Sequence, residues 1–198
     1  PTYSWENNGE DHTKNDVQDW DSRNARRFLE YTYTNKDGGT LFGFELGNEL
    51  RHKNKISNIT RVVNAYKELG SMVNEIWGEN PKPKLLGPAS TGVGETSYLL
   101  SQIGPHIQIA SYHKYHGGGK NPDLPSYAQH PSFYPHPMKL SGPGEAVKKY
   151  VMPDGNSSKK AQLWIGEGAM AYDSGLHGLT DTFHGSLWYA NILGALTK

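Results

Sequence analysis

Two glutamates, Glu49 and Glu167, stand at the ends of short apolar stretches of this sequence. Glu49 closes the run Leu41 to Glu49 (LFGFELGNE), and Glu167 lies in Gly166-Glu167-Gly168 after the apolar segment 162–165. In parallel-barrel enzymes, catalytic side chains sit at the C-terminal rim of the strands. Two carboxyl groups on opposite sides of a sugar are what glycoside hydrolysis uses: one protonates the leaving oxygen, and the other attacks the anomeric carbon or activates water.

A plainer interpretation of the two glutamates remains open, in which each is a solvated loop acid after a strand. Asn48 favours the catalytic interpretation, because an amide beside the acid can bond a sugar hydroxyl whose contact strengthens in the transition state. Gly47 lets the backbone turn, so that Asn48 and Glu49 emerge at the strand's carboxyl end.

The order of the elements around these residues predicts an α/β fold. Helices and strands are expected to alternate: helix 22–33, strand 41–44, helix 58–76, strand 84–88, helix 97–103, strand 106–113, helix 145–151, strand 162–165 and a last helix capped by Asp181. The Pro-rich stretch 120–143 predicts a long loop with one helical turn. Alternation of this kind is typical of a parallel sheet with helices outside it.

Three elements carry the clearest apolar patterns. Strand 41–44 is predicted to be buried on both faces. The second helix repeats apolar residues at steps of three and four, namely Val62, Tyr66, Leu69, Val73 and Ile76. The last helix is predicted to have an apolar face made by Leu187, Trp188, Ile192, Leu193 and Leu196.

Composition excludes some classes of function. The 198 residues carry 20 basic and 20 acidic side chains, so 20 − 20 gives a net charge of 0, which is unlike the basic footprint of a nucleic-acid binder. No apolar segment has the roughly 20 residues of a membrane span. Cysteine is absent. Two sequons, beginning at Asn58 and Asn156, would permit N-glycosylation in a secretory compartment.

Several motifs in order resemble the heparanase family, glycoside hydrolase family 79, in the clan of retaining (β/α)8 enzymes. They are LGNE at Glu49, the aromatic and histidine cluster 112–116, and WIGEGAMAYDSG at Glu167 followed by a DTF helix; the similarity runs from Trp20 onward. The resemblance implies part of a (β/α)8 TIM barrel, about strands four to seven. With roughly 250 residues needed for a complete barrel, we expect a fragment lacking the other strands and the family's β-sandwich.

The resemblance also implies roles for individual residues. Glu49 would be the general acid and then base, and Glu167 the nucleophile of a retaining β-glucuronidase acting in endo or exo mode. The implied substrate contacts are Asn48 at the 2-hydroxyl, Tyr115 at the nucleophile or the glycone pocket with His113 in the same segment, Tyr172 beyond the nucleophile, and the backbone of Ser174 and Gly175 at the uronic acid carboxylate.

Some positions depart from the family pattern. Leu50 replaces the usual proline, and Asp173 and Ser174 stand where vertebrate enzymes have glycines. The loop 87–95 has no Arg or Lys where vertebrate heparanases contact sulfated sugar. Positive charge near the cleft could come only from Arg51, Lys53, Lys55, Lys114 and Lys120. The expected partner is a glucuronic-acid-containing polysaccharide or proteoglycan glycan, and a less charged glycan fits at least as well as a polysulfated one.

Two other functions remain open at this point: a catalytically silent carbohydrate-binding remnant, and a glycosidase of the same clan that acts on a neutral glycan. No cofactor is expected. His113 and His116 could be metal ligands, but no third ligand at a recognised spacing accompanies them, so no metal is predicted. The resemblance implies a secreted, extracellular, lysosomal or vacuolar location, and any membrane association is expected to come from a region that this chain lacks.

Overall fold

A computed structural model of the protein describes residues 20–35, 41–50, 58–129, 143–151 and 162–196. Helices and strands alternate along the chain, as the sequence predicts. In chain order the elements are α1 (Arg23–Thr34), β1 (Gly43–Glu45), α2 (Ile59–Trp77), β2 (Lys84–Thr91), α3 (Val93–Ile103), the 3-10 helix η4 (Gly104–His106), β3 (Ile109–Tyr115), α4 (Leu124–Gln129), α5 (Pro143–Tyr150), β4 (Leu163–Ala169) and α6 (Phe183–Leu196).

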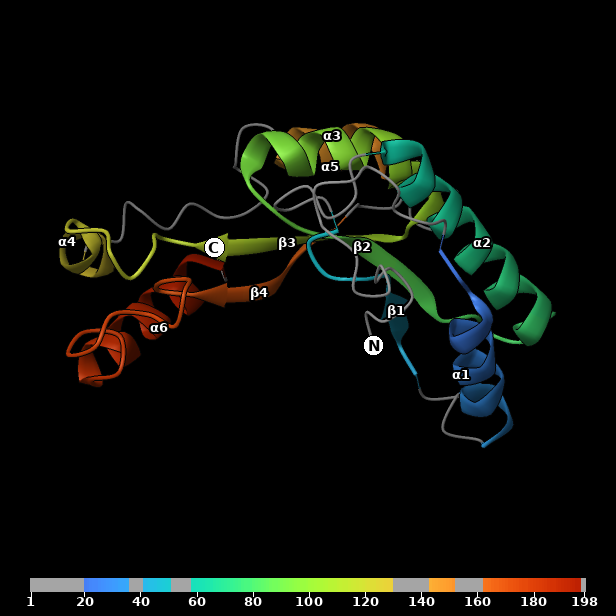
Figure 1. The fold of residues 1–198 in the computed structure, drawn as a ribbon, viewed down its shortest axis with the longest axis horizontal. Coiled ribbons are helices and arrows are strands. Elements are labelled where there is room, and N and C mark those ends of the chain that lie inside the picture. The colour runs from blue at the N-terminus through green and yellow to red at the C-terminus, as the bar shows by residue number, and fades with distance from the viewer. Residues whose placement is uncertain (1–19, 36–40, 51–57, 130–142, 152–161, 197–198) are drawn as a thin grey trace, which may run out of the picture.

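The four strands form one parallel sheet in the order β1-β2-β3-β4. Helices α2, α3 and α5 lie on one face of this sheet (Figure 1). The connection from each strand to the next therefore runs through a helix on the outside of the sheet, as in a βαβ unit. The predicted parallel α/β architecture is confirmed.

Helix α2 supplies much of the core on the covered face. Val62, Tyr66, Leu69 and Val73 are buried at the predicted helical spacing. Burying such apolar side chains stabilises the fold by about 1.5–3 kcal/mol each. The side chain of Asn58 caps the helix by accepting a bond of 2.9 Å from the backbone N–H of Thr60, which satisfies one of the unpaired donors of the first turn.

The sheet is curled, so that its two edges approach each other on the uncovered side. The rings of Phe42, just before β1, and Trp164, in β4, are stacked with centroids 5.2 Å apart. Three strand spacings would separate these edges by roughly 14 Å in a flat sheet. The contact thus requires strong curvature, and the described strands have the form of half a barrel. That they correspond to strands four to seven of a (β/α)8 barrel stays a prediction.

The prediction that residues 41–44 are buried on both faces is wrong. Leu41 is 37 % exposed and Phe42 56 % exposed, whereas Phe44 packs edge-on against Phe28 of α1 and Trp77 of α2. The reason is that β1 is an edge strand, and no other described element covers the concave face of the sheet.

Strands β3 and β4 run further than the sequence suggests. Lys114 and Tyr115 lie within β3, and Glu167 lies within β4, whereas the predicted strands ended at residues 113 and 165. Backbone pairing of His113 with Glu167 and of Tyr115 with Ala169 carries the ladder to the rim. The hydrogen bonds between strands are made by the backbone and do not depend on side-chain polarity, so polar residues do not end a strand that still pairs with a neighbour.

The start of α6 also differs from the prediction. Asp181 does not cap this helix; its carboxylate accepts from the backbone N–H of Gly178 at 2.7 Å and contacts His177. The hydroxyl of Thr182 instead accepts from the N–H of His184 at 3.3 Å. The cap lies one residue later because Asp181 closes the preceding turn.

A second, smaller apolar cluster joins α4, α6 and the segment after β4, with Leu124, Met170, Trp188 and Ile192 buried in it. Leu187 and Leu193, expected on the same face as Trp188, are exposed, since only part of the α6 surface faces α4. None of the helices in the described ranges is long and apolar enough to cross a membrane.

Candidate active site

Glu49, which follows β1, and Glu167, in β4, meet at the carboxyl rim of the sheet. One carboxylate oxygen from each lies within 4.8 Å of the other, and both lie within that distance of a ring nitrogen of His113 in β3. The two acids come from opposite edges of the sheet, so its curvature is what brings them together. Two carboxylates at this separation leave room for one sugar carbon between them.

The backbone of Glu49 is in the left-handed region, with φ of 47°. Such a conformation is costly for a non-glycine residue and persists only where neighbours fix it. Here the N–H of Glu49 donates to the carbonyl of Ala89 at 2.8 Å, and Ala89 is itself at φ 49°. The N–H of Ala89 donates to the hydroxyl of buried Ser111 at 2.8 Å. Ser111 of β3 thus helps to fix the backbone of Glu49 through Ala89 of β2.

Gly47 makes the turn that the sequence predicts, at φ 73°. A Cβ at this position would collide with the side chain of Leu50, which is buried against it. Leu50, which stands where the family usually has proline, therefore anchors the loop by packing. The buried hydroxyl of Tyr66 supports the same loop by donating to the carbonyl of Leu46 at 3.4 Å, and burial raises the pKa of this phenol.

Removing the Ser111 hydroxyl is expected to loosen this support. In Ser111→Ala the buried N–H of Ala89 loses its acceptor, which should lower the free energy of unfolding by about 1 to 3 kcal/mol. Chemical denaturation measures the change. Ser97→Ala is the matched control, because that hydroxyl donates to the carbonyl one turn back on the exposed side of α3 and supports no part of the site. Equal unfolding free energies for the two variants would contradict this role of Ser111.

Two side chains of β3 contact the acids. The Nδ1 atom of His113 lies 2.9 Å from Glu49 Oε1 and 3.7 Å from Glu167 Oε2, and the imidazole is only 2 % exposed. The hydroxyl of Tyr115 donates to Glu167 Oε1. Since an ionised carboxylate only accepts, Nδ1 carries the proton whenever it bonds ionised Glu49. Asn48 is exposed beside Glu49.

The remaining predicted residues form a neighbouring loop. Tyr172 is exposed, and its ring lies edge-on to that of Tyr115 at 6.2 Å between centroids. Ser174 and Gly175 follow at φ 65° and 79°. Ser174, one of the positions that depart from the family pattern, thus adopts a backbone conformation that glycine adopts at least cost. A groove of about 720 Å³ separates this loop from α6.

A glycine run clamps that loop from the other side. The N–H of Tyr172 donates to the carbonyl of Gly117 at 2.9 Å, and the N–H of Gly119 donates to the carbonyl of Tyr172 at 3.3 Å. A Cβ on Gly119 would overlap the carbonyl of Gly175. The absence of side chains along this run lets the two loops touch.

Replacing Gly119 by alanine is expected to push the 172–175 loop away from the site. Because the clash is with backbone, overpacking should cost about 1–3 kcal/mol of stability. Gly94→Ala is the control, since a Cβ there meets nothing within 4 Å and alanine favours the helix α3. Thermal unfolding of both variants measures the difference, and an unchanged melting temperature for Gly119→Ala would show that the loops do not depend on this contact.

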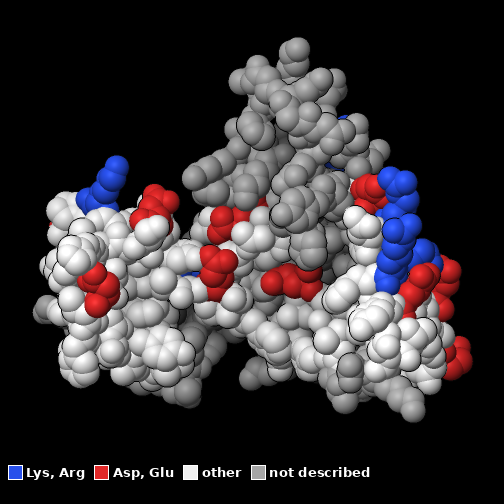
Figure 2. Space-filling model, turned by 60° about the horizontal axis from the view of Figure 1, so that its bottom comes forward, with Lys and Arg blue, Asp and Glu red and all other residues white. Residues whose placement is uncertain are grey.

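The electrostatic character of the site is acidic. A third carboxylate, Glu45 in β1, shares the concave face: its Oε1 lies 3.8 Å from the Cβ position of Gly166, which His113 also approaches. Sequence reasoning missed it, although Glu45 alternates with Phe44, whose ring faces the helices. Figure 2 shows acidic side chains gathered in the hollow of this side of the molecule.

The basic residues named from the sequence do not balance this charge. Lys114 alternates with His113 and Tyr115, so its side chain leaves the sheet on the other face; burial there lowers its pKa. Lys120 is exposed beyond the rim. Arg51, Lys53 and Lys55 lie outside the described residues.

Glu49, His113 and Glu167 also form a group that could hold a metal ion, because each offers a ligand atom within 4.8 Å of the other two. Nitrogen with two carboxylates is a common ligand set for divalent transition metals. Of the two histidines considered from the sequence, His113 belongs to this group and His116 does not. The Nδ1 atom of His116 instead accepts from Trp188 Nε1 at 3.1 Å. The absence of a metal from the reaction stays a prediction.

Comparison with known proteins places the chain among carbohydrate-active enzymes. Residues 6–194 match the model of the glycosyl hydrolase family 79 N-terminal domain. A baicalin-beta-D-glucuronidase of Scutellaria baicalensis is 29 % identical over 182 residues, covering 90 % of this chain and 33 % of the relative. Heparanase-like protein 2 of Arabidopsis thaliana is 29 % identical over 188 residues, covering 91 % of this chain and 33 % of the relative.

The chain therefore spans about a third of the length of the curated relatives it matches. Among solved structures, a xyloglucanase of Paenibacillus polymyxa from glycoside hydrolase family 44 superposes with a TM-score of 0.58 at 14 % identity, covering 86 % of this chain and 43 % of the other. At that identity the likeness concerns the fold, and it agrees with the barrel-like curvature of the sheet.

Proposed function

The chain belongs to glycosyl hydrolase family 79, and from this membership and the geometry of the rim we propose that it carries the catalytic pair of a retaining β-glucuronidase. The observation that carries the proposal is the approach of the Glu49 and Glu167 carboxylates to within 4.8 Å. Retaining glycosidases hold their two carboxyl groups about 5–5.5 Å apart, and inverting ones about 6.5–9.5 Å apart.

The proposed reaction is a double displacement. A carboxylate oxygen of Glu167 attacks the anomeric carbon while Glu49 gives its proton to the departing glycosidic oxygen, which forms a covalent glycosyl-enzyme and frees the aglycone. Glu49 then removes a proton from water, the water oxygen attacks the same carbon, and Glu167 leaves as a carboxylate. Two inversions give net retention of the anomeric configuration.

The neighbouring side chains suit these roles. The phenol of Tyr115 donates to Glu167, which fixes the orientation of the nucleophile. His113 is too buried to be a main sugar contact, and we assign it to holding Glu49, with the sugar's 2-hydroxyl left to exposed Asn48.

The proposed glycone is glucuronic acid, as the name of the Scutellaria relative suggests for that protein. We place its carboxylate at the backbone of Ser174 and Gly175, on the loop that Tyr172 links to Tyr115. The described part of the rim presents acids rather than lysines or arginines, and loop 87–95 has no basic residue. A glycan of low charge density is therefore preferred over a polysulfated chain.

Turnover of a chromogenic aryl β-glucuronide tests the proposal, with the matching β-glucoside as the neutral comparison. We expect hydrolysis of the glucuronide, loss of activity in Glu167→Gln, and first-formed β-glucuronic acid by NMR. Preference for the glucoside would instead support a glycosidase acting on neutral glycans. Absence of turnover together with a raised melting temperature in glucuronic acid would support a carbohydrate-binding role.

A further inference from the structure

A second cavity lies at the opposite end of the sheet from the two glutamates. It occupies about 450 Å³ between α2 and the segments that lead into β2 and β3. Its floor is apolar, with Tyr66, Val73 and Leu85 buried beneath it. The position at the amino ends of the strands separates it from the rim where Glu49 and Glu167 meet, so it belongs to neither the acids nor the loop at Ser174.

The lining of this cavity is cationic. Lys67 comes from α2, Lys82 from the segment before β2, Lys84 from the first position of β2, and His106 from η4. Among the described residues, none of those lining the cavity is aspartate or glutamate. The whole chain, in contrast, balances 20 basic against 20 acidic residues. Lys67, Lys82 and His106 come from separate segments, and together they give the cavity a positive field that attracts an anion.

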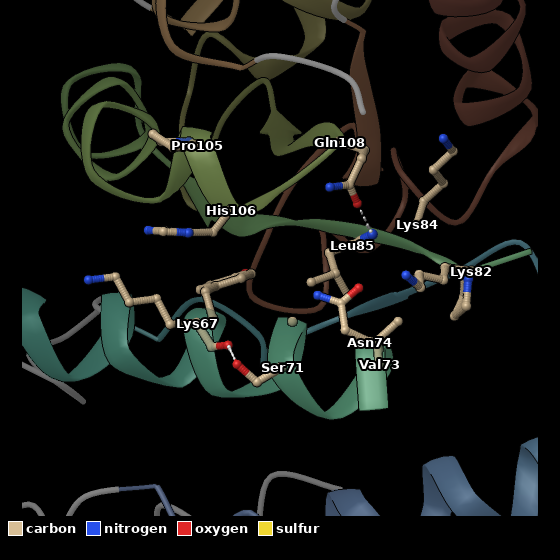
Figure 3. A pocket seen from close by; sticks show the side chains of 13 residues that line it. Lys67, Ser71, Val73, Asn74, Lys82, Lys84, Leu85, Pro105, His106 and Gln108 are labelled. Carbon is tan, nitrogen blue, oxygen red and sulfur yellow. Dashed lines mark hydrogen bonds between the residues drawn. The ribbon is translucent and has the colours of Figure 1, made fainter. Parts of the chain in front are cut away.

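Neutral hydrogen-bond donors complete the lining. The side-chain oxygen of Gln108 accepts from the backbone N–H of Leu85 at 2.7 Å, which orients the amide and leaves its NH2 group as a donor (Figure 3). Asn74 projects from α2 between Lys67 and His106 on one side of the view and Lys82 and Lys84 on the other. Amide donors between positive groups suit an acceptor with several oxygens.

The side chains of Lys67 and His106 interact electrostatically. The pKa of His106 lies below its usual value, chiefly because the ring is partly buried and further because of the charge of Lys67. Figure 3 shows both side chains at the same end of the cavity. An anion placed between them would offset their mutual repulsion.

We propose that this cavity between α2 and the amino ends of β2 and β3 binds a phosphate or sulfate group. The tetrahedral oxyanion would accept from Lys67 and His106, which lie at the same end of the cavity, with Lys82 adding long-range attraction. The group can be a free ion or an ester on a sugar, since both present the same oxygens.

NMR titration of the ¹⁵N-labelled chain tests this, using inorganic sulfate, inorganic phosphate and glucose 6-sulfate, with sodium chloride holding the ionic strength constant. We expect saturable shifts of the backbone amides at Gly70, Leu85 and His106. Lys67→Gln should weaken binding about tenfold, because one charge-assisted hydrogen bond is lost. Lys149→Gln removes the same charge from α5, outside the cavity, and should bind as the parent does.

The outcomes separate the possibilities. Binding of sulfate and glucose 6-sulfate with similar affinity supports a site open to esters, and binding of the inorganic ions alone supports a free-ion site. Shifts that fail to saturate, or that fall equally on lysines throughout the chain, overturn the proposal. So does equal binding by Lys67→Gln and the parent, and the spectrum of each variant reports directly that it is folded.

Discussion

Replacement of Glu167 by alanine is expected to lower turnover of an aryl β-glucuronide on the order of 10⁴-fold, the scale on which losing one member of a covalent catalytic set acts. The alanine variant has no carboxylate oxygen at position 167 to attack the anomeric carbon, so the glycosyl-enzyme should not form. The fold should survive, because the Glu167 side chain is 47 % exposed and exposed substitutions usually change stability by less than about 0.5 kcal/mol.

A small anionic nucleophile distinguishes this cause from general damage. Azide can occupy the space left by the carboxylate and attack the anomeric carbon once, from the face opposite the aglycone. The Glu167→Ala variant should therefore regain activity with azide and release the inverted α-glucuronosyl azide. Glu145→Ala, at an exposed position on α5, is the control and should keep parental turnover. Activity of Glu167→Ala without azide would remove Glu167 from the nucleophile role.

Much of this architecture could be predicted from periodicity. The spacing of Val62, Tyr66, Leu69 and Val73 predicts an amphipathic helix because burial on one face follows the 3.6-residue repeat. Gly47 before Asn48 and Glu49 predicts a turn because only glycine adopts φ of 73° at little cost. Both features are set by residues close together in the sequence, so the sequence of one chain is enough to predict them.

Contacts between distant segments were harder to foresee. The exposure of Phe42 follows from β1 being an edge strand, and strand order is not written in the local pattern. The support of Glu49 by Ser111 passes through the backbone of Ala89, so no side-chain motif marks it. The need for glycine at position 119 arises from the carbonyl of Gly175, 56 residues later by the difference 175 − 119. The proposed roles of the two acids come from the resemblance to a family, whereas the contacts that support Glu49 are visible only in the structure.

The two acids should respond differently when each is removed, although they lie within 4.8 Å of each other. Glu49→Ala is expected to slow hydrolysis of substrates with poor leaving groups by about 10² to 10⁴-fold, the usual contribution of general acid catalysis. A dinitrophenyl leaving group needs no proton, so formation of the glycosyl-enzyme should remain fast. Its hydrolysis should become slow because water loses its base, and stopped-flow absorbance should show a burst of dinitrophenolate.

Azide then assigns the acids independently. In Glu49→Ala it attacks the glycosyl-enzyme that Glu167 has already formed, so the product is the retained β-glucuronosyl azide, the opposite anomer to that from Glu167→Ala. Loss of Glu49 also leaves buried His113 without its acceptor, so Glu49→Gln, which keeps an oxygen there, controls for displacement of the imidazole. The same anomer from both variants, or equal slowing of good and poor leaving groups in Glu49→Ala, would contradict the assignment. Opposite anomers can arise only if the two acids act on opposite faces of the sugar, as a double displacement between β1 and β4 requires.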